Sequence, residues 1–85
     1  MAKIVVERLF KEPVEFETIQ KMEDESQWCL DLYNVKFLQT FFAADRKRMI
    51  CVYEAPDAEA VRSANRQAGV PFETVWTADV FEASG

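Results

Sequence analysis

The 85-residue sequence contains no histidine, the side chain that most often binds zinc or nickel and most often acts as a general base near neutral pH. Without it, neither a Ser-His-Asp nor a Cys-His catalytic set can form. The two cysteines, Cys29 and Cys51, lack the CxxC spacing of a metal or redox site, and we expect them to stay reduced. The composition therefore favours a protein without a metal or cofactor.

Long apolar runs and basic clusters are also scarce. No run approaches the roughly 20 apolar residues that span a bilayer, and Glu7 and Arg8 interrupt the first apolar stretch in a way that a signal peptide does not. We expect a cytoplasmic protein without a membrane partner. The net charge is -5, and the only basic cluster, residues 46–48, lies between two strand-like runs. That position favours a hairpin turn over a nucleic-acid contact.

The sequence is rich in apolar residues, and their spacing predicts an α+β fold in one domain, residues 1–85. Strand-like runs cover residues 3–10, 35–43, 48–55 and 73–82, and helical patterns occupy the first and third gaps between them. The order β-α-β-β-α-β with right-handed crossovers predicts a ferredoxin-like sandwich. Its strand order would be 4-1-3-2, with the helices on one face of the sheet.

Local signals refine the two helical regions. Pro13 is typical of the first turn of a helix, and the segment 24–26 either continues that helix or breaks it, with Ser26 capping the second piece. Both possibilities stay open. Asp57 is a plausible N-cap of the later helix, and Gly69 is expected to end it.

Alternation along the strands divides the predicted sheet into two faces. The set expected under the helices is Ile4, Val6, Leu38, Phe42, Ile50, Val52, Trp76, Ala78 and Val80. The set expected on the uncovered face is Val5, Glu7, Leu9, Val35, Phe37, Gln39, Phe41, Met49, Cys51, Tyr53, Val75, Thr77, Asp79 and Phe81. Because the second set is too apolar to face water across a whole sheet, we expect two copies to stack through it as a dimeric α+β barrel.

Polar groups in the second set predict a ligand site between the two sheets. A carboxylate, a thiol and a phenol among apolar side chains are typical of a small-molecule pocket. The candidate ligand-binding residues are Glu7, Phe37, Gln39, Cys51, Tyr53 and Asp79. A metal site formed by Glu7, Cys51 and Asp79 is a weaker hypothesis than a small-molecule site, because no spacing signature supports it. Cys51 as a buried core residue and Tyr53 as a rim residue remain alternatives.

Several motifs resemble a small ferredoxin-like family of unknown function that includes a streptomycete nickel-binding protein. They are Val6-Glu7-Arg8, Cys51-Val52-Tyr53-Glu54-Ala55-Pro56, Ala58-Glu59-Ala60-Val61-Arg62 and Ala68-Gly69-Val70-Pro71, which together cover about the whole chain apart from the first helix. The resemblance implies the same fold and a dimeric barrel. Where the family often has Trp-Leu-His-Ser in its second strand, this chain has Phe37-Leu38-Gln39-Thr40. Gln39 in the histidine position argues against nickel binding.

The sequence thus favours a small homodimeric binding protein of uncharacterised role that holds a small molecule, or as second choice a metal such as nickel, between its sheets. One alternative is an enzyme resembling the cofactor-free monooxygenases and isomerases of the dimeric α+β barrel type, with Glu7, Cys51 or Tyr53 as acid or base. Another is a structural or regulatory dimer without a ligand.

Overall fold

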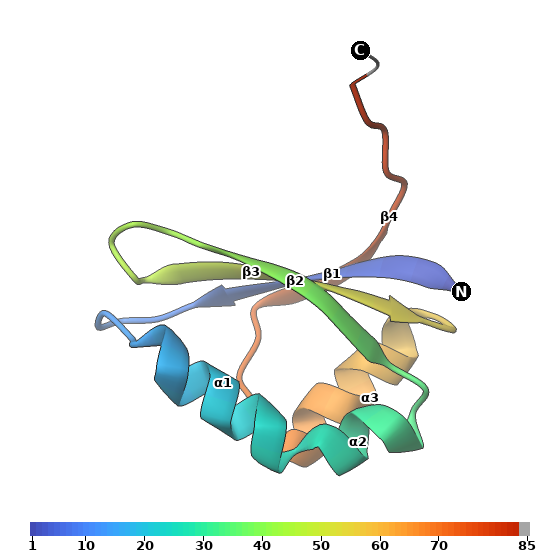
Figure 1. Cartoon of the computed structure of the whole chain (residues 1–85), viewed down its shortest axis with the longest axis horizontal. Coiled ribbons are helices and arrows are strands. Elements are labelled where there is room, and N and C mark those ends of the chain that lie inside the picture. Colours follow the sequence, from blue (N-terminus) through green and yellow to red (C-terminus); the bar gives the residue numbers. More distant parts are fainter. Residues whose placement is uncertain (84–85) are drawn as a thin grey trace.

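The computed structural model describes residues 1–83, which form a four-stranded antiparallel sheet with its helices on one face (Figure 1). The elements are β1 (Ala2–Leu9), α1 (Phe16–Glu25), α2 (Gln27–Leu32), β2 (Lys36–Phe42), β3 (Arg48–Ala55), α3 (Ala58–Ala68) and β4 (Thr74–Ala78). The sheet order is β2-β3-β1-β4. The predicted ferredoxin-like α+β fold and its strand order are confirmed. None of the helices in residues 1–83 has the length and apolar character that a membrane span requires.

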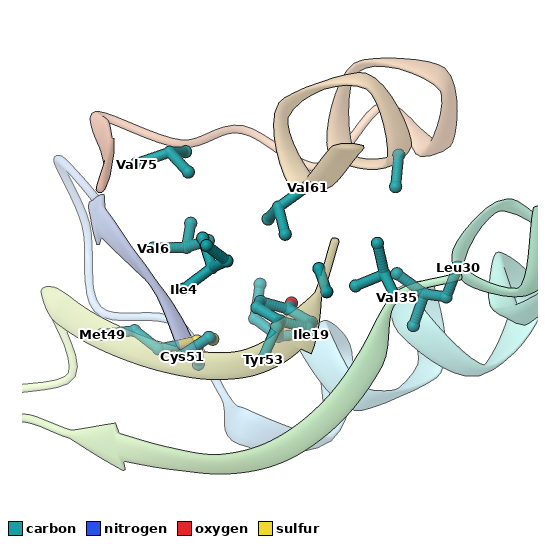
Figure 2. Close-up of a cluster of buried hydrophobic side chains, with 12 residues drawn as sticks. Ile4, Val6, Ile19, Leu30, Val35, Met49, Cys51, Tyr53, Val61 and Val75 are labelled. Atoms are coloured by element: carbon teal, nitrogen blue, oxygen red, sulfur yellow. The ribbon is translucent and has the colours of Figure 1, made fainter. Parts of the chain in front are cut away.

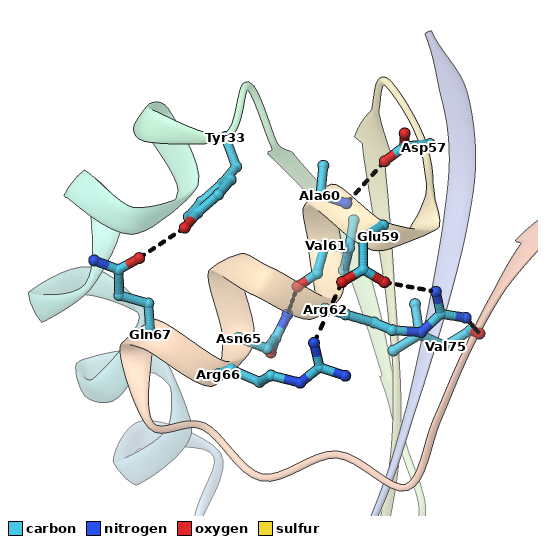
Figure 3. A network of polar contacts seen from close by, with 10 residues as sticks. All are labelled: Tyr33, Asp57, Glu59, Ala60, Val61, Arg62, Asn65, Arg66, Gln67 and Val75. Carbon is cyan, nitrogen blue, oxygen red and sulfur yellow. Dashed lines mark hydrogen bonds and ion pairs between the residues drawn. The ribbon is translucent and has the colours of Figure 1, made fainter.

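The ends of α3 follow the sequence signals. The Asp57 carboxylate accepts a hydrogen bond from the Ala60 backbone N–H at 2.8 Å (Figure 3), as expected of an N-cap. Gly69 ends the helix with a φ of 74°, a left-handed conformation that glycine adopts without steric cost. Arg62 on the same helix donates to the Val75 carbonyl at 3.0 Å and ties α3 to β4.

The first helical region is broken into α1 and α2 at Ser26. Ser26 occupies the N-cap position of α2, as predicted for a broken helix, but its side chain makes no cap hydrogen bond. Pro13 does not open α1. The backbone N–H of the next residue, Val14, donates to the Arg46 carbonyl at 2.9 Å, which holds this segment against the β2–β3 hairpin until α1 begins at Phe16.

The core lies between the sheet and the helices, and it corrects the predicted faces of β3 and β4 (Figure 2). Val6 pairs with Cys51 and with Val75. Residues directly opposite in an antiparallel pair share a face, so both partners lie under the helices with Val6. The same register places Met49 and Tyr53 in the core. Ile50, Val52 and Trp76 lie on the other side, opposite Glu7, Val5 and Val5 respectively.

A register shift in β2 between Phe37 and Gln39 explains a further difference. Phe37 pairs with Tyr53 and packs on the core with its ring 5.6 Å from the tyrosine ring, although alternation assigned it to the uncovered face. After the irregularity, Gln39 and Phe41 lie on the uncovered face as predicted, opposite Val52 and Ile50. An extra residue in a strand puts the side chains before it out of phase with those after it. Phe37 and Gln39, two residues apart, therefore lie on opposite faces.

Candidate functional site

The uncovered side of the sheet, called the open face below, is the candidate site. The register gives it residues from all four strands: Lys3, Val5, Glu7, Leu9, Lys36, Gln39, Phe41, Arg48, Ile50, Val52, Glu54, Thr74, Trp76 and Ala78. Leu9 and Phe41 are more than half exposed and Trp76 is nearly half exposed, despite their apolar side chains. A contiguous exposed apolar surface on a small protein usually marks an interaction site.

Glu7 is the polar centre of the open face. Its carboxylate accepts hydrogen bonds from Thr74 Oγ1 at 2.8 Å, Trp76 Nε1 at 3.1 Å and Arg48 Nη2 at 3.2 Å. These hydrogen bonds, that of Thr74 most, hold the pKa of Glu7 below its ordinary value of 4.5. Glu7 is therefore ionised and fixed in orientation at neutral pH, which suits an anchor for a ligand better than a general base.

Arg48 separates two shallow hollows on this side of the molecule. One hollow of about 360 Å³ is lined by Phe41, Phe42, Ala43, Arg48 and Ile50. The other, of about 300 Å³, is lined by Glu7, Leu9, Arg48, Glu73 and Thr74. An apolar wall beside a guanidinium and a carboxylate can receive the apolar body and the polar group of one small molecule.

The six predicted ligand-binding residues are only partly brought together. Glu7 and Gln39 share the open face, on β1 and β2 with β3 between them. Phe37, Cys51 and Tyr53 lie on the opposite side of the sheet, under the helices. Their predicted placement beside Glu7 was wrong. Asp79 follows the end of β4 and is exposed.

Cys51 is fully buried, and its sulfur accepts a hydrogen bond from Thr40 Oγ1 at 3.4 Å. The other thiol, Cys29, is also fully buried. Two inaccessible thiols behave as small apolar core residues.

Tyr53 belongs to a buried polar network that the sequence reading missed. Arg8 Nη2 donates to the Tyr53 hydroxyl at 3.1 Å and to Asn65 Oδ1 at 2.8 Å, and Arg8 Nη1 donates to the Pro71 carbonyl at 2.8 Å. The Tyr53 hydroxyl donates in turn to Glu23 Oε1 at 2.8 Å. Burial raises the pKa of Tyr53 well above its usual range. The signal was present, because Arg8 continues the core-facing alternation of Ile4 and Val6.

This network has a structural rather than a ligand-binding geometry. Glu23, Tyr53 and Asn65 line a cavity of about 10 Å³ between the sheet and the helices, which is room for a single water. Arg8 Nε has no hydrogen-bond partner among the described residues. The cavity itself has no space for a molecule larger than water.

The fold and the open face define a ferredoxin-like α+β protein whose candidate site is the surface of its own sheet. The chain belongs to a family of nickel-responsive proteins similar to SCO4226, because that family's model matches residues 5–77. The match confirms the suspected family and includes the first helical region.

The crystal structure of SCO4226 from Streptomyces coelicolor A3(2) has a TM-score of 0.83 to this protein. The match covers 95% of this chain and 100% of that chain at 17% sequence identity. At this identity the likeness shows the shared fold. No curated protein sequence matches the chain.

The donor atoms of this chain do not fit nickel. The sequence has no histidine, and both thiols are fully buried under the helices. Residues 1–83 contain no group of three histidine, cysteine, aspartate or glutamate side chains placed to hold one ion. Glu7, the carboxylate at the centre of the open face, already accepts three hydrogen bonds, one of them from a cationic guanidinium.

Proposed function

We propose that this protein is a homodimeric binding protein that stacks two open faces and holds a small organic molecule between them. The observation that supports the proposal most is the composition of the open face. Val5, Ile50 and Val52 form an apolar centre, and Glu7 lies beside it in a fixed, ionised state.

Stacking of two copies would convert the open face into an enclosed ligand site. Two sheets that pack face to face lie about 10 Å apart, with side chains from both filling the space between them. The hollows beside Arg48 are open on the isolated chain, and a second sheet would roof them. The molecule held there would place an apolar body against Phe41 and Ile50 and a hydrogen-bonding group near Arg48 or Glu7.

The placement of side chains gives less support to a cofactor-free enzyme. Cys51 and Tyr53 lie on the opposite side of the sheet from the proposed cavity, so neither can act as an acid or base there. Glu7 remains, and its lowered pKa makes it a weak base at neutral pH.

Native mass spectrometry of freshly purified protein, with light scattering over a range of concentrations, tests the proposal. We expect a dimer with a retained small molecule. A Val52→Lys variant should be monomeric, because it places a charge at the centre of the stacked faces. Glu25→Lys on the exposed side of α1 is the matched control and should remain dimeric. A wild-type protein that stays monomeric at every concentration would contradict the proposal.

A further inference from the structure

Residues 79–83, called the C-terminal arm below, extend from the sheet on the side opposite the helices (Figure 1). All five are exposed, and Phe81 is 90% exposed, the most of any large apolar residue in the part of the chain that the structure describes. Its neighbour Val80 is 58% exposed. No hydrogen bond or ion pair found within residues 1–83 involves the arm.

The sheet itself explains why the arm leaves. Ala78 at the end of β4 pairs with Lys3, and β1 begins one residue earlier, at Ala2. A longer β4 would soon have no neighbouring strand to bond with. The predicted strand over 73–82 was therefore too long at its end, and Val80, which was expected under the helices, is exposed instead.

The apolar hollow that could bury Phe81 lies at the other end of the sheet. That hollow contains Arg48, which pairs with Leu9. The distance along β1 from Lys3 to Leu9 is about 20 Å at 3.3 Å per residue. Phe81 is three residues past Ala78, a reach of at most about 11 Å. The arm cannot fill the hollow of its own chain.

Charge also favours contact between the arm and the hairpin end of the sheet. The arm carries Asp79 and Glu82, whereas the hairpin carries the only basic cluster of the chain, residues 46–48. Arg48 is 59% exposed and lines the hollow of Phe41 and Ile50. An acidic segment with a central phenylalanine is complementary to an apolar hollow with a basic rim.

We propose that the arm of each copy crosses to the second copy and inserts Phe81 into the hollow lined by Phe41, Arg48 and Ile50. The inference rests on the proposed face-to-face dimer and adds to it. Phe81 of one chain becomes a wall of the ligand cavity on the other, so each cavity is incomplete until both chains are present.

A pair of engineered cysteines tests this contact. The double variant Phe41→Cys, Phe81→Cys should form a disulfide-linked dimer when oxidised glutathione is added. The control combines Phe81→Cys with Glu25→Cys and should form no such dimer, because Glu25 is an exposed residue of α1, on the other side of the sheet from the arm (Figure 1). The natural thiols do not compete, since both are fully buried. Equally efficient dimer formation by Phe81→Cys alone would overturn the proposal, because it would show the two arms meeting each other instead.

The strength of the dimer gives an independent measurement. Phe81→Ser should weaken dimerisation about tenfold or more, since the hydrophobic burial of one phenylalanine per arm is lost. Reversal of the charge by Glu82→Lys should also weaken the dimer, because it removes an acidic group that is complementary to the basic hairpin.

The two proposals fail differently. A monomeric wild type removes the dimer and the arm contact together. A wild-type dimer that keeps its dissociation constant in Phe81→Ser and gives no Phe41–Phe81 cross-link overturns the arm contact alone and leaves the stacked faces standing.

Discussion

Arg8 donates a hydrogen bond from Nη2 to the hydroxyl of Tyr53 at 3.1 Å, and both side chains are 1% exposed. The two residues come from β1 and β3, the central strands of the sheet. Tyr53 extends the contact to Glu23 on α1, and Arg8 extends it to Asn65 on α3. One buried guanidinium thus joins both layers of the fold.

Removing the guanidinium should destabilise the protein strongly. Arg8→Ala leaves Glu23, Tyr53 and Asn65 buried or half-buried without their partner, and breaking a buried pair of this kind costs about 3–5 kcal/mol. Urea denaturation followed by circular dichroism measures the free energy of unfolding. Lys11→Ala, at an exposed position, is the control and should change little. Equal stability of the two variants would show that the network contributes nothing.

Glu7 should give the fold a pH dependence. Its pKa is lowered in the folded state, so its contribution to stability is fully present above the unfolded value of 4.5 and is lost as the pH falls through the folded pKa. The melting temperature of wild type should exceed that of Glu7→Gln most at neutral pH. The difference between the two melting temperatures should decrease as the pH falls into the acidic range. A difference in melting temperature between the two proteins that stays constant with pH would refute the assignment.

The buried thiols should be unreactive in the native state. Cys29 and Cys51 are both fully buried, and reaction with a thiol reagent such as DTNB requires access to the sulfur. We expect almost no colour from native protein and two thiols per chain in urea. Fast reaction of one thiol in native wild type, absent from Cys51→Ala, would mean that Cys51 is accessible.

Nickel should not change the melting temperature of the wild-type protein, because the chain offers neither histidine nor an accessible thiol. The double variant Gln39→His, Val52→His is a useful positive control. These positions lie directly opposite each other on β2 and β3 and face away from the helices. Two imidazoles there should raise the melting temperature with nickel, and a comparable rise in wild type would contradict the prediction.

The sequence predicted the element order and the strand order because hydrophobic periods and turn residues decide both. The side chains of β3 were assigned to the wrong faces because the two alternating sets of that strand, Met49-Cys51-Tyr53 and Ile50-Val52, are similarly apolar. Only pairing with β1 distinguishes them, and pairing is a long-range property. The faces of β1 were predicted correctly, because Ile4 and Val6 are apolar whereas Glu7 is charged.

For the same reason, only Glu7 and Gln39 of the six predicted ligand-binding residues lie on the open face. Arg48, Thr74 and Trp76 reach Glu7 from β3 and β4, and no local pattern in the sequence joins them to it. The shift at Phe37 and Gln39 is also invisible to a simple period of two.

The two outer strands of the sheet have a consequence for how the protein behaves in concentrated solution. An outer strand with free backbone groups is a template on which other chains can add strand by strand and grow into fibres. Here β4 is only five residues long and the chain then turns out of the sheet, while β2 is interrupted by its register shift. Both edge strands are therefore poor templates for the addition of further strands. Despite a surface rich in aromatic residues, concentrated samples should resist the growth of amyloid-like fibres.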